Sequence, residues 1–218
     1  MYPLTRPNRP LPSKAVSPKY ALISSIILFI SGSISVLFLS VYAKIIALFV
    51  VLPLIIVYNI KLKKLPLIGN AIISAILGLT FLFSGAVFGN MNKMLIPCFL
   101  AFGLTFVREI IKDIEDIAGD QLEGVSTFPI IAGLNKAKNL TVILAILIGF
   151  GSLLPYFSGI YSLWYLIFLI LGVEIPLVML VVLIMKSPSK KTYSFLSKLL
   201  KVSIVFGIFA IYFGSIYE

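Results

Sequence analysis

The sequence at residues 161–185 reads YSLWYLIFLILGVEIPLVMLVVLIM, with Glu174 as its one charged residue. A membrane-spanning helix needs roughly 20 apolar residues, and this block supplies them. Similar blocks lie near residues 20–40, 43–60, 67–88, 94–112, 139–157 and 198–216. Lipid offers no partner to backbone N–H and C=O groups, so each block is expected to form a helix. The sequence therefore predicts an all-α fold, a polytopic transmembrane helix bundle of about seven spans.

The overall composition agrees with this class. Hydrophobic residues make up 60% of the 218 residues and charged residues 12%, which is more apolar surface than one soluble core can bury. The net charge is +10, but the basic residues are spread between the apolar blocks. Such a distribution favours membrane lipids with anionic headgroups as partners and gives no reason to expect nucleic acid.

The basic residues also predict the orientation. Sixteen of the eighteen Lys and Arg residues lie in connections around residues 1–19, 61–64, 108–138 and 186–201, and the other two are Lys44 and Lys93. Connections rich in Lys and Arg stay in the cytoplasm. We therefore expect a multi-pass cell-membrane protein with the N-terminus and these connections in the cytoplasm and the C-terminus outside.

The acidic residues are gathered in one place. Residues 108–123 read REIIKDIEDIAGDQLE and hold six of the eight Asp and Glu residues, for a net charge of −4. Carboxylates crowded at a membrane surface repel one another and lose hydration unless cations join them. If the helix continues past Arg108, at about 100° per residue, four carboxylates share a strip about 60° wide, with Glu115 on another face. These four are Glu109, Asp113, Asp116 and Asp120.

Magnesium is the expected cofactor, because the stretch offers only oxygen ligands and the chain has no histidine. Mg²⁺ is usually held by one or two carboxylates, with water and substrate phosphates completing its shell. A phosphorylated substrate is thereby expected. Basic and phenolic groups suited to phosphate lie in connections on the same side, among them Arg9, Tyr58, Lys61 and Lys63.

Four segments, at residues 6–13 (RPNRPLPS), 58–70, 108–120 and 127–133, carry a family resemblance. In order and spacing they resemble the UbiA-type intramembrane prenyltransferases, especially the archaeal branch that makes digeranylgeranylglyceryl phosphate. The resemblance implies that Asp116 and Asp120 bind Mg²⁺ and that Glu109 and Asp113 support them or accept a proton. It implies substrate contacts by a further set of residues: Asn8, Arg9, Tyr58, Lys61, Lys63, Arg108 and Lys112.

The implied chemistry is ionisation of an allylic C–O bond, followed by capture of the cation by a nucleophile. A prenyl group, geranylgeranyl or similar, would pass from its diphosphate to a lipid-like acceptor such as geranylgeranylglyceryl phosphate, in membrane ether-lipid synthesis. A quinone or aromatic acceptor is equally compatible with the motifs. The two substrates, a prenyl diphosphate and a lipid or aromatic acceptor, are the expected small-molecule partners.

Members of this family normally carry two earlier spans, the second ending in another Asp-rich motif. We therefore expect residues 1–218 to form a single prenyltransferase-like domain that corresponds to the last seven of nine spans. The alternative is a truncated, non-catalytic relative that binds prenyl lipid or pairs with a full-length paralogue, as a homo- or hetero-oligomer. A cation transporter would place its acids in mid-membrane, where only Glu174 lies, beside Pro176. That carboxyl is either functional or a partner for backbone groups freed by the proline.

Overall fold

The computed structural model describes residues 10–186 and 188–216. Seven stretches in these ranges are long and apolar enough to cross a membrane, and no strand is present in them, which confirms the predicted all-α membrane fold. In chain order the spans are α1 (Pro18–Val36); α2 (Val41–Lys44) with η1 (Ile45–Val51) and α3 (Leu52–Ile60); α4 (Ile68–Phe88); η3 (Asn92–Met94) with α5 (Leu95–Glu115); α8 (Leu134–Phe157); α9 (Leu163–Leu169) with η4 (Ile170–Glu174) and α10 (Ile175–Met185); and α11 (Lys190–Ile216).

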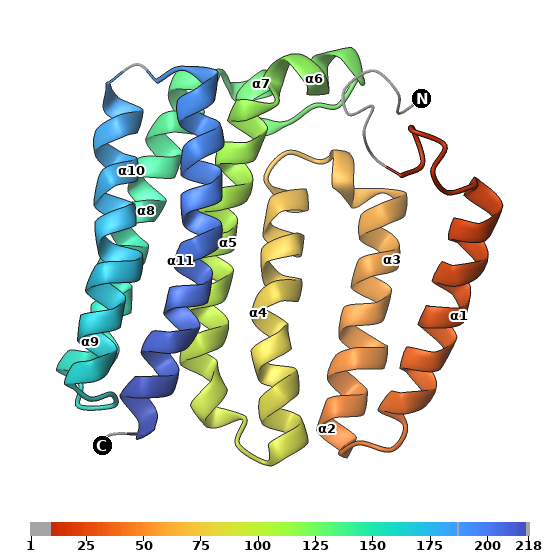
Figure 1. Cartoon of the computed structure of the whole chain (residues 1–218), viewed down its shortest axis with the longest axis horizontal. Coiled ribbons are helices and arrows are strands. Elements are labelled where there is room, and N and C mark those ends of the chain that lie inside the picture. Colours follow the sequence, from red (N-terminus) through yellow and green to blue (C-terminus); the bar gives the residue numbers. More distant parts are fainter. Residues whose placement is uncertain (1–9, 187, 217–218) are drawn as a thin grey trace.

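Consecutive spans run in opposite directions and lie side by side (Figure 1). The short helices α6 (Ile117–Leu122) and α7 (Phe128–Ala132) lie across one end of the bundle. The α3–α4 and α10–α11 connections reach the same end, so the loops that the sequence assigns to one side of the membrane do share one side. That this side is cytoplasmic stays a prediction.

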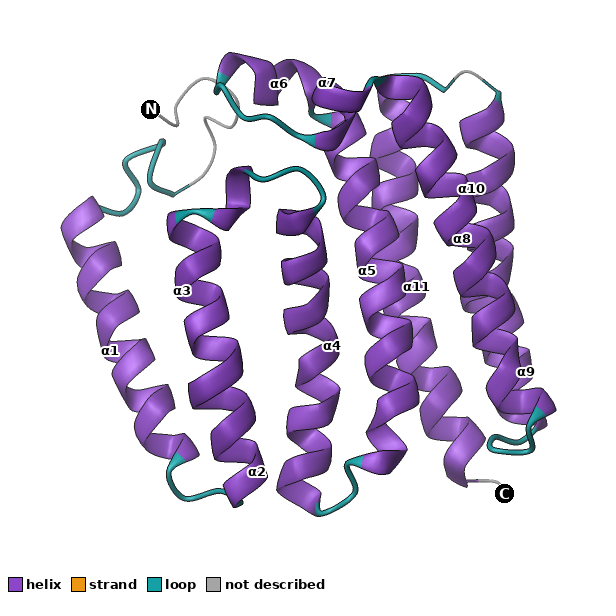
Figure 2. Cartoon of the chain, turned by 180° about the vertical axis from the view of Figure 1, so that it is seen from behind, coloured by secondary structure: helices purple, strands orange, loops and turns teal. Residues whose placement is uncertain are grey.

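The core lies around α5, which packs against α4, α8 and α11 (Figure 2). Its buried face has large side chains toward its C-terminal end and small ones toward its N-terminal end. At Gly103 a Cβ atom would stand 2.9 Å from the Ile148 side chain of α8, so the two helices are in close contact there. The buried large residues of α5 are Leu104, Val107, Ile110, Ile111 and Ile114.

The first span contributes nothing to this core. No residue of α1 is buried, and its large apolar side chains, such as Leu28 at 70% exposure, face outward. In water such a helix would be unstable, whereas in a bilayer the surrounding lipid is as apolar as the side chains. The exposed surface of α1 therefore agrees with a membrane-embedded chain.

Two of the spans change to π-helix just before a proline. The π segment η1 precedes Pro53, and η4 precedes Pro176. Proline lacks the N–H that would bond to the carbonyl four residues earlier, and a wider turn accommodates the missing bond. Glu174 is the last residue of η4, and it accepts a hydrogen bond from the Ser152 hydroxyl of α8. The hydrogen-bond partner of the Glu174 carboxyl in the described residues thus lies on a neighbouring helix.

Several helices run past the apolar blocks that the sequence marks. The last span begins at Lys190 instead of near residue 198, and α5 continues to Glu115 instead of ending near residue 112. Hydropathy marks only the lipid-facing part of a helix, and the backbone hydrogen bonding continues into the polar region beyond it.

Candidate functional site

The acidic stretch folds as two helices with a bend between them. Glu109 and Asp113 lie in the last two turns of α5, whereas Asp116 separates α5 from α6 and has φ −101° and ψ 10°. The expectation of one helix continuing past Arg108 to Asp120 is therefore wrong beyond Glu115. A straight helix would project about 12 Å over its next eight residues without neighbours. The bend instead lets Ile117 pack against the main core.

The bend does not scatter the carboxylates, because all four predicted residues line one cavity of about 580 Å³. This volume is in the range of small-molecule sites. The cavity lies at the end of the bundle where α6 crosses it, and its walls come from α3, α4, α5, α6 and the segment before α7. It collects eight of the predicted site residues: Tyr58, Lys61, Lys63, Glu109, Lys112, Asp113, Asp116 and Asp120.

The α3–α4 connection brings two lysines to the cavity that the acids line. Lys61 follows the end of α3, and Lys63 lies in the short 3₁₀ turn η2 (Leu62–Lys64). This turn packs tightly on the start of α4, since a Cβ atom at Gly69 would stand 3.2 Å from the Leu62 carbonyl oxygen and 3.3 Å from that of Lys63. The close approach holds the turn against the cavity.

The start of α4 is tied to the end of α5 by side chains. The Asn70 amide donates a hydrogen bond of 2.8 Å to Oδ2 of Asp113. Asp113 is also close enough to Asp120 and Glu109 for their charges to repel its own, while Lys112 attracts it. The amide and the lysine thus hold Asp113 in place among other carboxylates.

Glu109 is bonded to both basic residues of its own helix that were predicted to contact the substrate, Arg108 and Lys112. Arg108 Nη1 donates to Glu109 Oε1 at 2.6 Å, and Lys112 Nζ donates to Oε2 at 2.9 Å. Glu109 and Lys112 line the cavity, whereas Arg108 does not. Arg108 therefore contacts Glu109 from outside the cavity lining. The predicted contact of Arg108 with a substrate phosphate stays a prediction.

The side chains that line the cavity fit an Mg²⁺ ion whose other ligands are water and substrate phosphate. Asp116 and Asp120 contribute carboxylates, and the lining residues include no histidine or cysteine. Within residues 10–186 and 188–216, no three acidic, histidine or cysteine side chains converge as a ready-made metal centre. One or two carboxylates completed by water and phosphate need no such centre, so the residues present suit the expected cofactor.

Some residues of the site carried no specific assignment in the sequence interpretation. Asn70 lay in a matched segment without a role, and Lys190 counted only as a basic residue of a connection. Both line the cavity, as do Ser126 and Thr127. Lys190 belongs to no matched segment, and tertiary packing brings it to the acids. The predicted substrate residues Asn8 and Arg9 lie outside the described residues.

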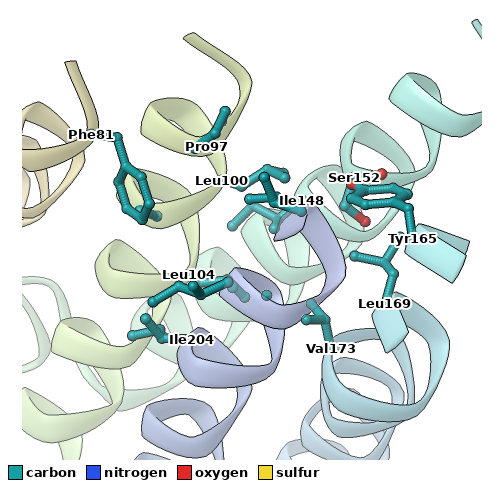
Figure 3. Close-up of a pocket in the computed structure, with 14 residues that line it drawn as sticks. Phe81, Pro97, Leu100, Leu104, Ile148, Ser152, Tyr165, Leu169, Val173 and Ile204 are labelled. Atoms are coloured by element: carbon teal, nitrogen blue, oxygen red, sulfur yellow. Dashed lines mark hydrogen bonds between the residues drawn. The ribbon is translucent and has the colours of Figure 1, made fainter. Parts of the chain in front are cut away.

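A second, apolar cavity lies inside the bundle, between α4, α5, α8, α9 and α11 (Figure 3). Phe81, Leu100, Leu104 and Ile148 line it, and Ser152 and Tyr165 add polar atoms. Its volume is about 20 Å³, room for about one water molecule. The larger cavity beside the acids is thus the better candidate for a substrate site.

Comparison with known proteins identifies the family of this chain. The model of the UbiA prenyltransferase family matches residues 3–212. The chain belongs to this family. Its predicted enzyme class, prenyltransferase, is thereby confirmed, as is the predicted family.

Curated relatives in the family are similar over nearly the whole chain. The digeranylgeranylglyceryl phosphate synthase of Methanosphaera stadtmanae is 37% identical over 98% of this chain and 78% of its own length. That of Saccharolobus solfataricus is 38% identical over 98% and 75%. A solved structure, described as giving insights into the biosynthesis of digeranylgeranylglyceryl phosphate synthase in membranes, has a TM-score of 0.77 and 34% identity, covering 99% of this chain and 76% of its own.

Proposed function

We propose that this prenyltransferase moves a geranylgeranyl group from its diphosphate to the hydroxyl of geranylgeranylglyceryl phosphate, with Mg²⁺ as cofactor. The proposed substrates are inferred from the relatives, which are digeranylgeranylglyceryl phosphate synthases. The observation that carries the proposal is the single cavity in which acidic and basic side chains from distant helices meet at the end of the spans. Such a site suits the charged headgroup of a prenyl diphosphate.

In the proposed reaction the allylic C–O bond of the donor breaks, and its electron pair leaves with the diphosphate. The acceptor hydroxyl oxygen then forms a bond to the allylic carbon and loses its proton. Lys61 and Lys63 are suited to stabilise charge that grows on the leaving diphosphate. Mg²⁺, held by Asp116 and Asp120, would supply further stabilisation of that charge.

The two remaining predicted carboxylates, Glu109 and Asp113, suit different tasks. Glu109 already holds two basic side chains at 2.6 and 2.9 Å, so we assign it to fixing the wall of the cavity. Asp113, oriented by Asn70, is the better candidate to take the proton from the acceptor hydroxyl. A positioned base of this kind typically accelerates a reaction about 10²- to 10⁴-fold.

The experiment uses the full chain in detergent, with labelled geranylgeranyl diphosphate and geranylgeranylglyceryl phosphate. We expect an ether-linked product in Mg²⁺ and none in EDTA. Asp116→Asn and Asp120→Asn should each lower the rate by about 100-fold or more. Glu115→Gln is the matched control, since Glu115 is adjacent to Asp116 but does not line the cavity.

Three results would contradict the proposal. Equal rates for wild type and Asp116→Asn would exclude the assigned metal site. Transfer to a quinone precursor or another aromatic acceptor, with none to the glyceryl phosphate, would replace the proposed acceptor. Absence of diphosphate release from wild type under all conditions would favour a non-catalytic relative.

A further inference from the structure

One basic residue reaches the cavity from a helix that carries none of the predicted site residues. Lys190 is the first residue of α11 and lines the cavity together with the acids of α5 and α6. Its side chain is exposed. Although five carboxylates line the same cavity, Lys190 forms no ion pair within the described ranges. Its charge is thus available to an anionic ligand.

Hydroxyl groups accompany this lysine on the cavity wall. Ser126 and Thr127 lie in the segment before α7, and both line the cavity. Thr127 occupies the capping position of α7 but its side chain makes no capping bond. Its Oγ1 atom is buried and has no hydrogen-bond partner among the described residues. A buried hydroxyl left unpaired is costly, so a ligand that pairs with it gains affinity.

Lys112 of α5 is bonded to Glu109, and the other three lysines of the cavity come from two separate parts of the fold. Lys61 and Lys63 come from the α3–α4 connection, whereas Lys190 comes from α11, and α5 packs between α4 and α11 (Figure 1). A reaction that joins a diphosphate to a phosphate-bearing acceptor brings two anionic groups into one site. Their repulsion is reduced when each has its own cation and the two are held apart.

We propose that Lys190, with the hydroxyl groups of Thr127 and Ser126, forms a second anion subsite that binds the phosphate monoester of the lipid acceptor. This inference rests on the proposed function for the identity of the acceptor. The subsite makes Lys190 a determinant of acceptor specificity, because a lipid that ends in a free hydroxyl would leave the lysine and the buried threonine hydroxyl without a partner.

The first experiment measures binding to the full chain in detergent, with EDTA present. The probes are geranylgeranylglyceryl phosphate, the dephosphorylated alcohol and inorganic phosphate. We expect Lys190→Gln to weaken binding of the phosphate lipid about tenfold and to leave binding of the alcohol unchanged. Thr127→Val should act in the same direction, with recovery in Thr127→Ser. Lys191→Gln is the matched control, because this neighbour loses the same charge and does not line the cavity.

The second experiment measures kinetics. The KM for the phosphate lipid should rise in Lys190→Gln, while the KM for geranylgeranyl diphosphate and the donor-only release of diphosphate stay unchanged. Any of three results would overturn the subsite. Lys191→Gln could have the same effect as Lys190→Gln, or the wild type could bind the phosphate lipid and the alcohol with equal affinity. The third is a change in Lys190→Gln that is confined to the KM for geranylgeranyl diphosphate. If binding of inorganic phosphate depends on Lys190 and binding of the phosphate lipid does not, the lipid is not the ligand of Lys190, and the proposal fails.

The two proposals fail separately. Binding of the phosphate lipid that depends on Lys190, without prenyl transfer by the wild type, would confirm the subsite and reject the proposed function. Transfer that is insensitive to Lys190→Gln at all acceptor concentrations would reject the subsite and leave the proposed function standing.

Discussion

The Asn70 amide and the Asp113 carboxylate, 43 residues apart in the chain, are joined by a hydrogen bond of 2.8 Å. This bond connects the first turn of α4 to the last turns of α5. It therefore links the helix that follows the basic connection to the helix that carries two of the acids. The geometry of the cavity depends on this connection as much as on the acids themselves.

Replacing Asn70 by alanine should lower kcat about tenfold, because Asp113 loses the donor that orients it and a bond to a polar partner is worth about 1–3 kcal/mol. Asn70→Asp should lower it further, since a second carboxylate would repel Asp113. Steady-state rates of prenyl transfer test both. Asn90→Ala, at the opposite end of α4, is the control. Wild-type activity in Asn70→Asp would disprove the role of this bond.

Gly69→Ala tests how the basic connection is held. The added Cβ would stand 3.2 Å from the Leu62 carbonyl oxygen, so the turn that carries Lys61 and Lys63 must shift by a few tenths of an ångström. We expect the KM for prenyl diphosphate to rise about three- to tenfold, with little change in melting temperature. Gly32→Ala, where no atom lies within 4 Å, should leave the KM unchanged. A lower melting temperature with an unchanged KM would mean that the contact is only structural.

Glu109→Gln should destabilise the protein by about 2 kcal/mol, because two basic side chains lose their half-buried partner. The Glu109 side chain is 15% exposed and that of Arg108 is 22% exposed. Water can therefore replace the lost ion pairs only in part. Thermal unfolding in detergent measures the change. Adding Arg108→Gln should restore part of the loss, because it removes one unpaired charge. Strictly additive losses in the double variant would show that the pair does not interact.

Close packing of α11 on the sixth span predicts sensitivity at Gly172. A Cβ atom there would stand 2.2 Å from Cβ of Phe206, so one helix must move. We expect Gly172→Ala to cost about 1–3 kcal/mol in unfolding free energy. Gly151→Ala is the matched control, because no atom lies within 4 Å of that position and alanine favours helix by about 0.5–1 kcal/mol. Equal stability of the two variants would contradict the close contact.

Substitutions at Ser152 and Glu174, which share a hydrogen bond, test whether the carboxyl of Glu174 has more than a packing role. Interhelical hydrogen bonds in membranes average about 0.6 kcal/mol, so Ser152→Ala should lower stability only slightly. Glu174→Gln keeps an acceptor for Ser152 and should preserve both stability and prenyl transfer. A tenfold or greater loss of transfer in Glu174→Gln, with unchanged melting, would instead assign a functional role to the carboxyl.

Much of the cavity could be predicted from sequence because its acids are neighbours in the chain. Asp116 and Asp120 belong to one motif, and Tyr58, Lys61 and Lys63 belong to another. The predicted geometry was wrong where it assumed a straight helix, since the gain from packing Ile117 against the core was invisible in the local pattern. Lys190 could not be assigned to the cavity, because its separation from the acids in sequence gives no measure of its distance from them in space.

The sequence by itself determined the seven spans, the shared side of the charged connections and the family. These features follow from the need of each lipid-embedded segment for about 20 apolar residues with internal hydrogen bonds. Only the tertiary structure decided the bend at Asp116, the bond from Asn70 to Asp113, the position of Arg108 behind Glu109 and the approach of Lys190. Each of these arises from the packing of helices against one another, which is a property of the whole bundle and of no single segment.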